Sequence, residues 1–289
     1  MASVSARADQ APHYSSHQSM REGQPMKFEN IKVTTDGAQA RIALARPDKL
    51  NSLDEATMIE LHSAVDRIAN DPTIRVLVLT GEGRAFCAGQ DLADPAMQIV
   101  HGKLPDIGNL VERHFKPLVM KLQNLPIPTV AAVNGLAAGG GASLALACDV
   151  VVAARSAYFL QAFSRIGLSP DTGSTWFLTH RVGIARAMGL ALFADKLPAE
   201  KAAEWGLIWD VIDDTEFGVR IDALVQRIAQ MPTKAMVRTR QLMLAAAVHT
   251  LEQQLSMEAT SIRELGWSQD YQEGVNAFTE KRQPNFTGN

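Results

Sequence analysis

The segment TVAAVNGLAAGGGASLALACDVVVAA, residues 129–154, decides the fold class of this chain. Its two ends, TVAAVNG (129–135) and DVVVAA (149–154), are short and almost wholly apolar, which is typical of strands buried on both faces. Between them lie three successive glycines and the small-residue stretch 140–147, which we expect to be a helix. A strand, a helix and a second strand in this order indicate a layered α/β core.

The sequence on either side extends this pattern. Further strands are predicted by IKVTT (31–35), ARIALA (40–45) and IRVLVLT (74–80), the first two separated by a turn and therefore read as a hairpin. From Leu53 to Ile68 apolar residues recur at helical spacing, and Ser52 with Glu55 matches a capping box at the start of that helix. A further helix is predicted over 109–124.

From about residue 184 the strand signals stop. Helical windows then follow one another at 184–193, 198–206, 217–230, 233–247, 250–266 and 270–281. An appended helical region commonly exposes apolar faces that need a partner, so we expect self-association there. We therefore predict a core over residues 27–197 and a helical oligomerisation region over 198–289. Residues 1–26 lack an apolar signal segment and are expected to be a disordered extension.

The composition narrows the class of partner. With a net charge of −3 the chain has no excess of basic residues, so general binding to nucleic acid or to an anionic membrane is not expected. No apolar run reaches the roughly 18 residues that cross a bilayer. The only two cysteines, Cys87 and Cys148, lie in apolar stretches, which fits a reducing compartment and a cytoplasmic protein. The histidines show no metal-ligand spacing, so no metal site is predicted.

Two glycine-rich stretches each follow a predicted buried strand: GEGRAFCAGQDL (81–92) and NGLAAGGGASLALACD (134–149). Neither fits a dinucleotide-binding G-x-G-x-x-G turn or a P-loop. Glycines can instead bring bare backbone N–H groups close to a ligand oxygen, and two such donors make an oxyanion hole. The alternative is that the glycines at 139–141 only allow close packing of helix against strand, and their spacing leaves both interpretations open.

Together these stretches resemble the enoyl-CoA hydratase/isomerase, or crotonase, superfamily. Phe86 to Asp91 is similar to its F-x-A-G-x-D loop, and Asn134 to Gly141 is similar to its N-G-x-A-x-G-G-G loop. RPDKLNSLD (46–54) and EGVNAFTEKRQPNFTG (273–288) resemble its N-terminal signature and its closing motif. The resemblance covers residues 28–288. It implies an α/β fold, a crotonase-like spiral of ββα units with a C-terminal helical trimerisation region, assembled as a trimer or hexamer.

The resemblance also implies an acyl-CoA substrate and no cofactor apart from the coenzyme A that the substrate carries. Two backbone amides would polarise its thioester carbonyl, and by motif position these are Ala88 and Gly140. Each preorganised donor to a developing enolate oxygen is worth roughly 2.7 to 4 kcal/mol. Other implied binding residues are Lys49, Gln90, Asp91, Leu92, Gly139, His114, Phe115, Phe163 and Lys281. For the two lysines a solvated side chain is an equal alternative, and a lone helical histidine such as His114 is usually structural.

The carboxylates indicate which reaction to expect. Hydratases of the superfamily hold and activate water with two glutamates, and the matching positions here are Ser143 and Phe163. Water addition needs one group to orient water and one to deliver the proton, so ordinary hydration is not expected. Asp171 stands where some isomerases of the superfamily place their acid, and one carboxylate suffices to move a proton. Its pKa, ~3.9 in a free side chain, should be raised by Ala162, Phe163, Leu168 and Trp176.

The sequence leaves alternatives open both for the role of Asp171 and for the function of the protein. Asp171 is also a suitable N-cap for a helix that begins near Gly173, and one residue can serve both purposes. AARSAYFLQAFSRIGLSPDTGSTW (153–176) resembles the isomerase branch of the superfamily, so we predict an acyl-CoA isomerase. A hydratase that recruits another group, or a catalytically silent acyl-CoA-binding protein, are the rivals. Cys87 has no paired base nearby and is not expected to act as a nucleophile.

Overall fold

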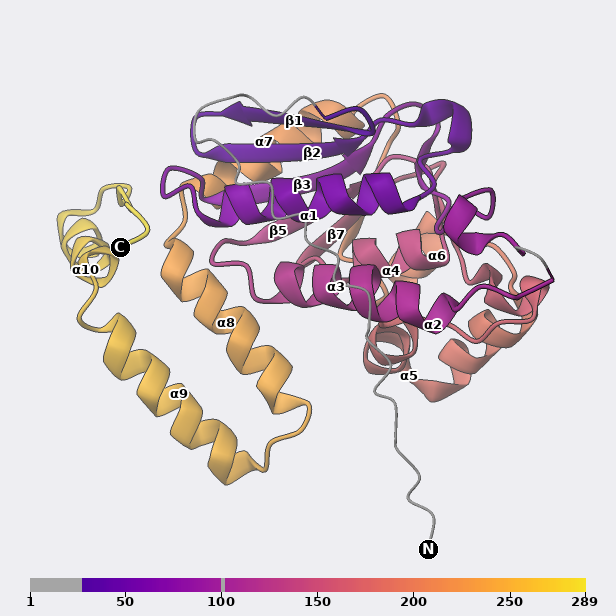
Figure 1. Ribbon diagram of the computed structural model, residues 1–289. Helices are drawn as coiled ribbons and strands as arrows, with labels where there is room; N and C mark the ends of the chain where they lie inside the picture. Colours follow the sequence, from indigo (N-terminus) through magenta and orange to yellow (C-terminus); the bar gives the residue numbers. More distant parts are fainter. Residues whose placement is uncertain (1–27, 100–101) are drawn as a thin grey trace, which may run out of the picture.

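The computed structural model describes residues 28–99 and 102–289, and helices and strands alternate through its core (Figure 1). The extension predicted for residues 1–26 lies outside the described residues. The strands are β1 (Ile31–Asp36), β2 (Gln39–Leu44), β3 (Val76–Gly81), β4 (Ala85–Cys87), β5 (Thr129–Val133), β6 (Leu136–Ala138), β7 (Val150–Ala154), β8 (Tyr158–Leu160), β9 (Leu197–Pro198) and β10 (Asp210–Ile212). The helices are α1 (Glu55–Ala69), α2 (Ile107–Leu110), α3 (Lys116–Gln123), α4 (Gly140–Leu146), α5 (Ser174–Phe193), α6 (Ala199–Glu204), α7 (Phe217–Ala229), α8 (Thr233–Ala246), α9 (Leu251–Leu265) and α10 (Gln269–Glu280). A π-helical turn, Val111–Phe115, joins α2 to α3, and a 3-10 turn, Ala162–Ile166, precedes α5.

Two sheets organise the core. The larger has the strand order β1-β2-β3-β5-β7-β10 and the smaller has the order β4-β6-β8-β9. The predicted hairpin is confirmed, because β1 and β2 pair in antiparallel fashion, whereas β2 to β10 are joined by parallel pairings. Each of β3, β5 and β7 is followed directly by a short strand of the smaller sheet, and then by a helical segment. This repeat is the predicted spiral of ββα units.

The central strands of the larger sheet, β3, β5 and β7, are buried on both faces, as their apolar sequences predict. On β3, Leu77 and Leu79 belong to the core cluster that contains Leu61 of α1. Val76 and Val78 instead belong to a second cluster that contains residues of α7. Helices α1 and α7 therefore cover opposite faces of the sheet.

Helix α1 begins later than the capping box predicts. Its first residue is Glu55, and its N-cap is Asp54, whose carboxylate accepts a backbone N–H of the first turn at 2.8 Å. Leu53 forms an isolated parallel bridge with Gln90. Because that pairing requires extended backbone at Leu53, the helix cannot start there, and the predicted cap at Ser52 is wrong.

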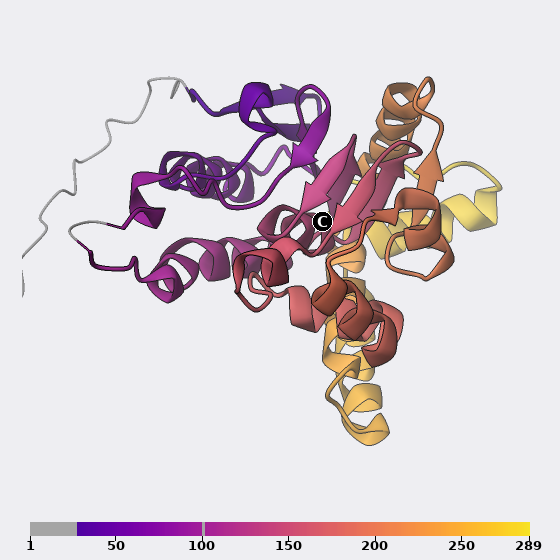
Figure 2. The same cartoon turned by 90° about the vertical axis from the view of Figure 1, so that its right-hand side faces the viewer.

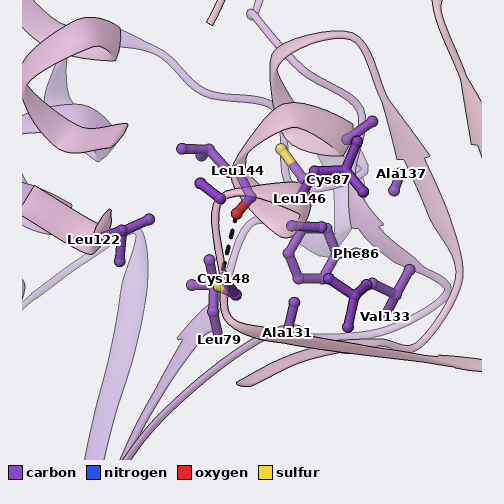
Figure 3. Packing of buried hydrophobic residues seen from close by; sticks show 14 of the residues in the cluster. Leu79, Phe86, Cys87, Leu122, Ala131, Val133, Ala137, Leu144, Leu146 and Cys148 are labelled. Carbon is purple, nitrogen blue, oxygen red and sulfur yellow. Dashed lines mark hydrogen bonds between the residues drawn. The ribbon is translucent and has the colours of Figure 1, made fainter. Parts of the chain in front are cut away.

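The strand β4 anchors the first glycine-rich loop in the core. Its Phe86 is fully buried in the cluster that contains Leu146 and Val133 (Figure 3). Burying a phenylalanine side chain contributes on the order of 1.5 to 3 kcal/mol, so this contact fixes where the following loop leaves the sheet. Both cysteines, Cys87 and Cys148, are free and buried in the same cluster.

The strand signals do not stop at residue 184. The three-residue β10 pairs in parallel with β7 at the edge of the larger sheet, and Ile221 and Val225 of α7 are buried against that sheet. The region predicted to be purely helical from residue 198 therefore begins with elements of the core. Helix α5 begins at Ser174, as expected for a helix near Gly173, and it bends at Gly183, where φ is 75°, so the predicted window 184–193 is its second half.

Helices α8, α9 and α10 extend away from this core (Figures 1 and 2). These helices and the link between α9 and α10 expose large apolar side chains, as predicted for this region: Met243, Leu251, Ile262, Trp267 and Phe278. Self-association through these faces stays a prediction. Over residues 28–99 and 102–289, none of the helices combines the length and apolar character that a membrane crossing needs.

Candidate active site

A cavity of about 260 Å³ lies where the two glycine-rich loops meet the segment that carries Asp171. The predicted site residues that line it are Ala88, Gln90, Leu92, Phe115, Gly139, Gly140, Phe163 and Asp171. Most of the remaining wall is apolar. Among the described residues that line it, Asp171 is the only acidic residue and Arg165 the only basic one. The sequence alone therefore identified the loops that converge on this cavity.

The glycines allow close packing, which was one of the two interpretations that their spacing left open. A Cβ on Gly141 would lie 2.5 Å from the carbonyl oxygen of Cys87, so this glycine permits close packing of α4 on β4. A Cβ on Gly89, where φ is 90°, would lie 2.8 Å from the oxygen of Ala138 and 3.3 Å from the nitrogen of Gly140. Gly89 therefore allows the first loop to approach the second at the cavity.

The prediction that Ala88 supplies an oxyanion donor is wrong. Its amide donates a hydrogen bond of 3.0 Å to the carbonyl oxygen of Leu50, so this N–H is not free to bind a ligand. Ala88 still lines the cavity, but its amide is engaged elsewhere.

The amide of Gln90 takes the place assigned to Ala88. Leu53 donates to the oxygen of Gly89 at 2.8 Å and accepts from the nitrogen of Asp91 at 2.9 Å. In such a parallel bridge the peptide N–H of the residue between, Gln90, points away from Leu53. Within the described residues this amide has no acceptor, and Gln90 lines the cavity. The motif alone did not reveal this, because it does not show with which residue the loop pairs.

Gly140 fits its predicted place. It is the first residue of α4, after an N-cap glycine at 139, and amides of a first helical turn have no intrahelical acceptor. In the part of the chain that the structure describes, the Gly140 amide has no hydrogen-bond partner. The site thus offers two backbone donors at one end of the cavity, from Gln90 and Gly140.

Asp171 lines the cavity and does not cap α5. The N-cap of that helix is Gly173, which has no side chain to offer, and the main-chain oxygen of Asp171 accepts the N–H of Ser174 at 2.8 Å. The helix-cap alternative is therefore wrong. The Asp171 carboxylate instead accepts a hydrogen bond of 2.8 Å from the hydroxyl of Thr172. Burial raises the pKa of Asp171 above its ordinary value, and the bond from Thr172 opposes that rise.

The two positions that matched the glutamates of hydratases are occupied by groups that cannot activate water. Ser143 is fully buried, and its hydroxyl is shared between the hydroxyl of Ser174 and the carbonyl oxygen of Gly139. Phe163 is buried in the cavity wall, with its ring 3.7 Å from where a Cβ on Gly139 would be. These contacts tie the segment of Asp171 to the second glycine-rich loop.

The π-helical turn separates two neighbouring residues that the sequence had grouped. Phe115 lines the cavity, but His114 is turned toward α1, where its Nε2 lies 3.1 Å from a carboxylate oxygen of Glu55. The prediction that His114 binds the acyl group is therefore wrong. Trp176 does not line the cavity either, contrary to expectation. Sequence reasoning missed apolar wall residues that come from the segment 97–111, which carries no motif: Met97, Ile107, Leu110 and Val111.

Besides His114, three predicted binding residues lie outside the cavity wall. Lys49 and Lys281 are exposed, and their contact with coenzyme A stays a prediction. Asp91 accepts from Arg46 at 2.9 Å, and the same guanidinium contacts Asp54 at 2.8 Å. Asp91 therefore fastens the loop to the segment before α1.

The described residues give little support to nucleophilic catalysis by a cysteine or to a metal site. Burial raises the pKa of the Cys87 thiol to about 12, so it is not a nucleophile at neutral pH. Over the described ranges, no three His, Cys, Asp or Glu side chains cluster as a metal site would require.

Comparisons with known proteins agree with this geometry. The family model described as Enoyl-CoA hydratase/isomerase matches residues 34–289. A 1,2-epoxyphenylacetyl-CoA isomerase of Escherichia coli (strain K12) is 48% identical over 247 residues, 86% of this chain and 94% of that protein. A probable enoyl-CoA hydratase of Rhodobacter capsulatus is 45% identical over 263 residues, 91% of this chain and 100% of that protein. The crystal structure of an enoyl-CoA hydratase from Bacillus anthracis superposes with a TM-score of 0.84 at 30% identity, covering 90% of this chain and 100% of that chain. The predicted crotonase-like fold is confirmed.

Proposed function

Because this chain belongs to the enoyl-CoA hydratase/isomerase family, we propose that it is an acyl-CoA isomerase. Its substrates are 1,2-epoxyphenylacetyl-CoA, 3-enoyl-CoA thioesters, or both. The observation that carries this proposal is that Asp171 is the only carboxylate among the described residues of a largely apolar cavity wall, to which two backbone amides without a partner in the described chain also belong. The 48% identity to an isomerase supports the same choice.

The geometry suits movement of a double bond toward the thioester. The Asp171 carboxylate removes a proton from C2 of a 3-enoyl thioester, and the electron pair left behind delocalises onto the carbonyl oxygen as an enolate. The amides of Gln90 and Gly140 donate hydrogen bonds to that oxygen. The protonated Asp171 then returns the same proton to C4, so the double bond lies between C2 and C3 and the base is regenerated.

The backbone donors and the apolar wall contribute to catalysis in different ways. A backbone donor aimed at the enolate oxygen is worth roughly 2.7 to 4 kcal/mol, and two such donors therefore account for a large part of the acceleration. The apolar wall excludes water and raises the pKa of Asp171, which makes the carboxylate a stronger base. The cavity is smaller than a site for a whole coenzyme A molecule, so it would hold the acyl group and the thioester.

Hydration is the second candidate, favoured by the 45% identity to a probable enoyl-CoA hydratase. Against it, the positions that would carry the two glutamates hold Ser143, whose hydroxyl is engaged, and Phe163, whose ring fills the wall. The described wall thus offers one carboxylate in place of the two that hold water and deliver the α-proton in hydratases of the superfamily. We therefore place isomerisation ahead of hydration.

The same proposal covers the metabolic role, the location and the assembly of the protein. An enzyme with these substrates would serve phenylacetate catabolism or fatty acid metabolism in the cytoplasm. It would act as a trimer or hexamer assembled through α8, α9 and α10, and it would need no cofactor beyond the coenzyme A of its substrate. The exposed apolar side chains of those helices support the assembly.

One experiment tests the reaction class. The purified protein is incubated separately with 3-hexenoyl-CoA, 2-hexenoyl-CoA and 1,2-epoxyphenylacetyl-CoA, and the products are identified by mass spectrometry and chromatography. The proposal expects 2-hexenoyl-CoA from the first substrate or oxepin-CoA from the epoxide, with little 3-hydroxyhexanoyl-CoA from the second. Formation of the 3-hydroxy product at a comparable rate would instead identify a hydratase. Tight binding without turnover of any of the three would identify a binding protein.

A further inference from the structure

The segment from Asp171 to Ser174 is a tight turn with an unusual residue in it. The oxygen of Asp171 accepts the N–H of Ser174 at 2.8 Å, and the two residues between have φ angles of 52° at Thr172 and 82° at Gly173. Positive φ at both central positions is the signature of a type I′ turn. Glycine at the second of them is expected.

Threonine at the first central position is not expected. That position favours asparagine, aspartate or glycine, and a β-branched residue with left-handed backbone is a genuine outlier. Such strain persists only where the surroundings fix it, and it is concentrated at functional sites. Here the next residue, Ser174, holds the turn in place because its hydroxyl is bonded to that of buried Ser143.

The Thr172 side chain lies beside the Asp171 carboxylate and close to Gly140. It is only 4% exposed, and its hydroxyl donates to Oδ1 of Asp171 at 2.8 Å. The same hydroxyl lies 3.4 Å from where a Cβ on Gly140 would be, so it sits between the base and the loop that supplies an amide donor. A residue chosen only for the turn would not place a hydroxyl there.

We propose that Thr172 is a positioning residue of the isomerase: its hydroxyl fixes the Asp171 carboxylate in the orientation that reaches the substrate and favours its ionised form. This inference rests on the proposed function. The strained backbone at Thr172 is the structural cost of presenting the hydroxyl to the base. Since Thr172 does not touch the reacting atoms, it acts through Asp171.

The pH dependence follows from the groups that face Asp171. Within the described chain, α4 carries no ionisable side chain, and Arg165 of the 3-10 turn is the only other charged residue of the cavity wall. The π-helical turn carries Glu112, Arg113 and His114, and none of these lines the cavity. Because the Thr172 hydroxyl stabilises the ionised carboxylate, its removal should raise the pKa of Asp171. The acidic limb of the pH profile of kcat should then move to higher pH.

The first test compares Thr172→Val with Thr172→Ser. Valine keeps the shape and loses the hydroxyl, and a hydrogen bond to a charged group is strong enough for a loss of about tenfold or more in kcat. KM for 3-hexenoyl-CoA should stay within about threefold, and the acidic limb should shift upward by roughly one pH unit. Serine keeps the hydroxyl and should retain kcat within about threefold. Valine with wild-type kcat and pH profile, or serine as impaired as valine, would overturn the proposal.

A third variant separates positioning from stability. Thr172→Gly relieves the left-handed backbone and also lacks the hydroxyl, so it remains informative even if the valine variant fails to fold. We expect its unfolding midpoint in urea to equal or exceed that of the wild type, while kcat and the acidic limb change as in Thr172→Val. A glycine variant with wild-type kcat and pH profile would contradict the inference.

Asp171→Asn, measured in parallel, shows which claim fails. If Asp171→Asn retains isomerase activity, the base assignment in the proposed function is wrong. If it loses activity while Thr172→Val does not, only the positioning role is wrong.

Discussion

Replacing Gly89 with alanine should disable the oxyanion site without touching Asp171. Gly89 has a φ of 90°, and the new Cβ would lie 2.8 Å from the oxygen of Ala138 and 3.3 Å from the nitrogen of Gly140. The first distance is too short for real atoms, and the obstacle is backbone, so the two loops must separate. The Gly140 and Gln90 amides would then no longer converge on one oxygen.

The expected effect of Gly89→Ala has two parts, a loss of stability and a loss of kcat. Left-handed backbone at alanine costs about 1 to 2 kcal/mol of stability. Loss of one oxyanion donor costs ~2.7 to 4 kcal/mol of transition-state stabilisation, which lowers kcat by about 10² to 10³. Gly37→Ala is the matched control, because Gly37 also has positive φ, 54°, but nothing lies within 4 Å of its added Cβ. It shares the backbone cost and lacks the contact with the loops.

Both variants are compared by urea unfolding and by steady-state isomerisation of 3-hexenoyl-CoA, followed through the absorbance of the conjugated product. Gly37→Ala should lose about 1 to 2 kcal/mol of stability and keep wild-type kcat. Gly89→Ala should lose at least as much stability, and its kcat should fall by about 10² to 10³ under conditions where both variants are folded. A kcat for Gly89→Ala within threefold of that for Gly37→Ala would refute the reasoning about the two loops.

Three further outcomes are expected. Gly140→Pro removes the second N–H donor at a helix position that tolerates proline, so kcat should fall by about 10² to 10³ in the same assay, and wild-type activity would refute the assignment of that amide. Burial raises the pKa of Asp171, and only its ionised form is a base. As pH falls, kcat should therefore decrease around a pKa that is higher than that of an ordinary aspartate. An acidic limb at the ordinary aspartate position would contradict this. Burial also raises the pKa of the Cys87 and Cys148 thiols to about 12. Iodoacetamide at pH 8 should therefore leave both thiols unmodified in the folded protein and alkylate both in urea, as measured by mass spectrometry. Rapid labelling of the folded protein would contradict their burial.

Much of the core and the convergence of the site segments could be predicted from sequence. Short, almost wholly apolar strands such as the one at 129–133 have to be buried on both faces, and the periodic helices at 217–230 and 250–266 match α7 and α9 closely. Asp171 could be placed at the cavity because the resemblance extends through the segment that carries it. In each case the signal is local, either a hydrophobic pattern or a motif.

The errors came from features that depend on pairing between distant segments. The choice of Gln90 over Ala88 follows from the bridge to Leu53, which no motif encodes. His114 and Phe115 face different ways because of a π-helical turn that ordinary helical periodicity does not predict. The strand β10 is only three residues long, too short to show a period, and is held by its pairing with β7. Tertiary context decided all three.

The most direct test of the account is the activity of Asp171→Asn toward 3-hexenoyl-CoA, measured alongside its affinity for the same thioester. The substitution keeps the size of the side chain and removes the base, while the amides of Gln90 and Gly140 remain. The account predicts that double-bond migration falls to below a few per cent of the wild-type rate, roughly the scale expected for loss of a general base, with thioester affinity little changed. Retention of a larger share of turnover would show that another group moves the proton, and the proposed mechanism would be wrong.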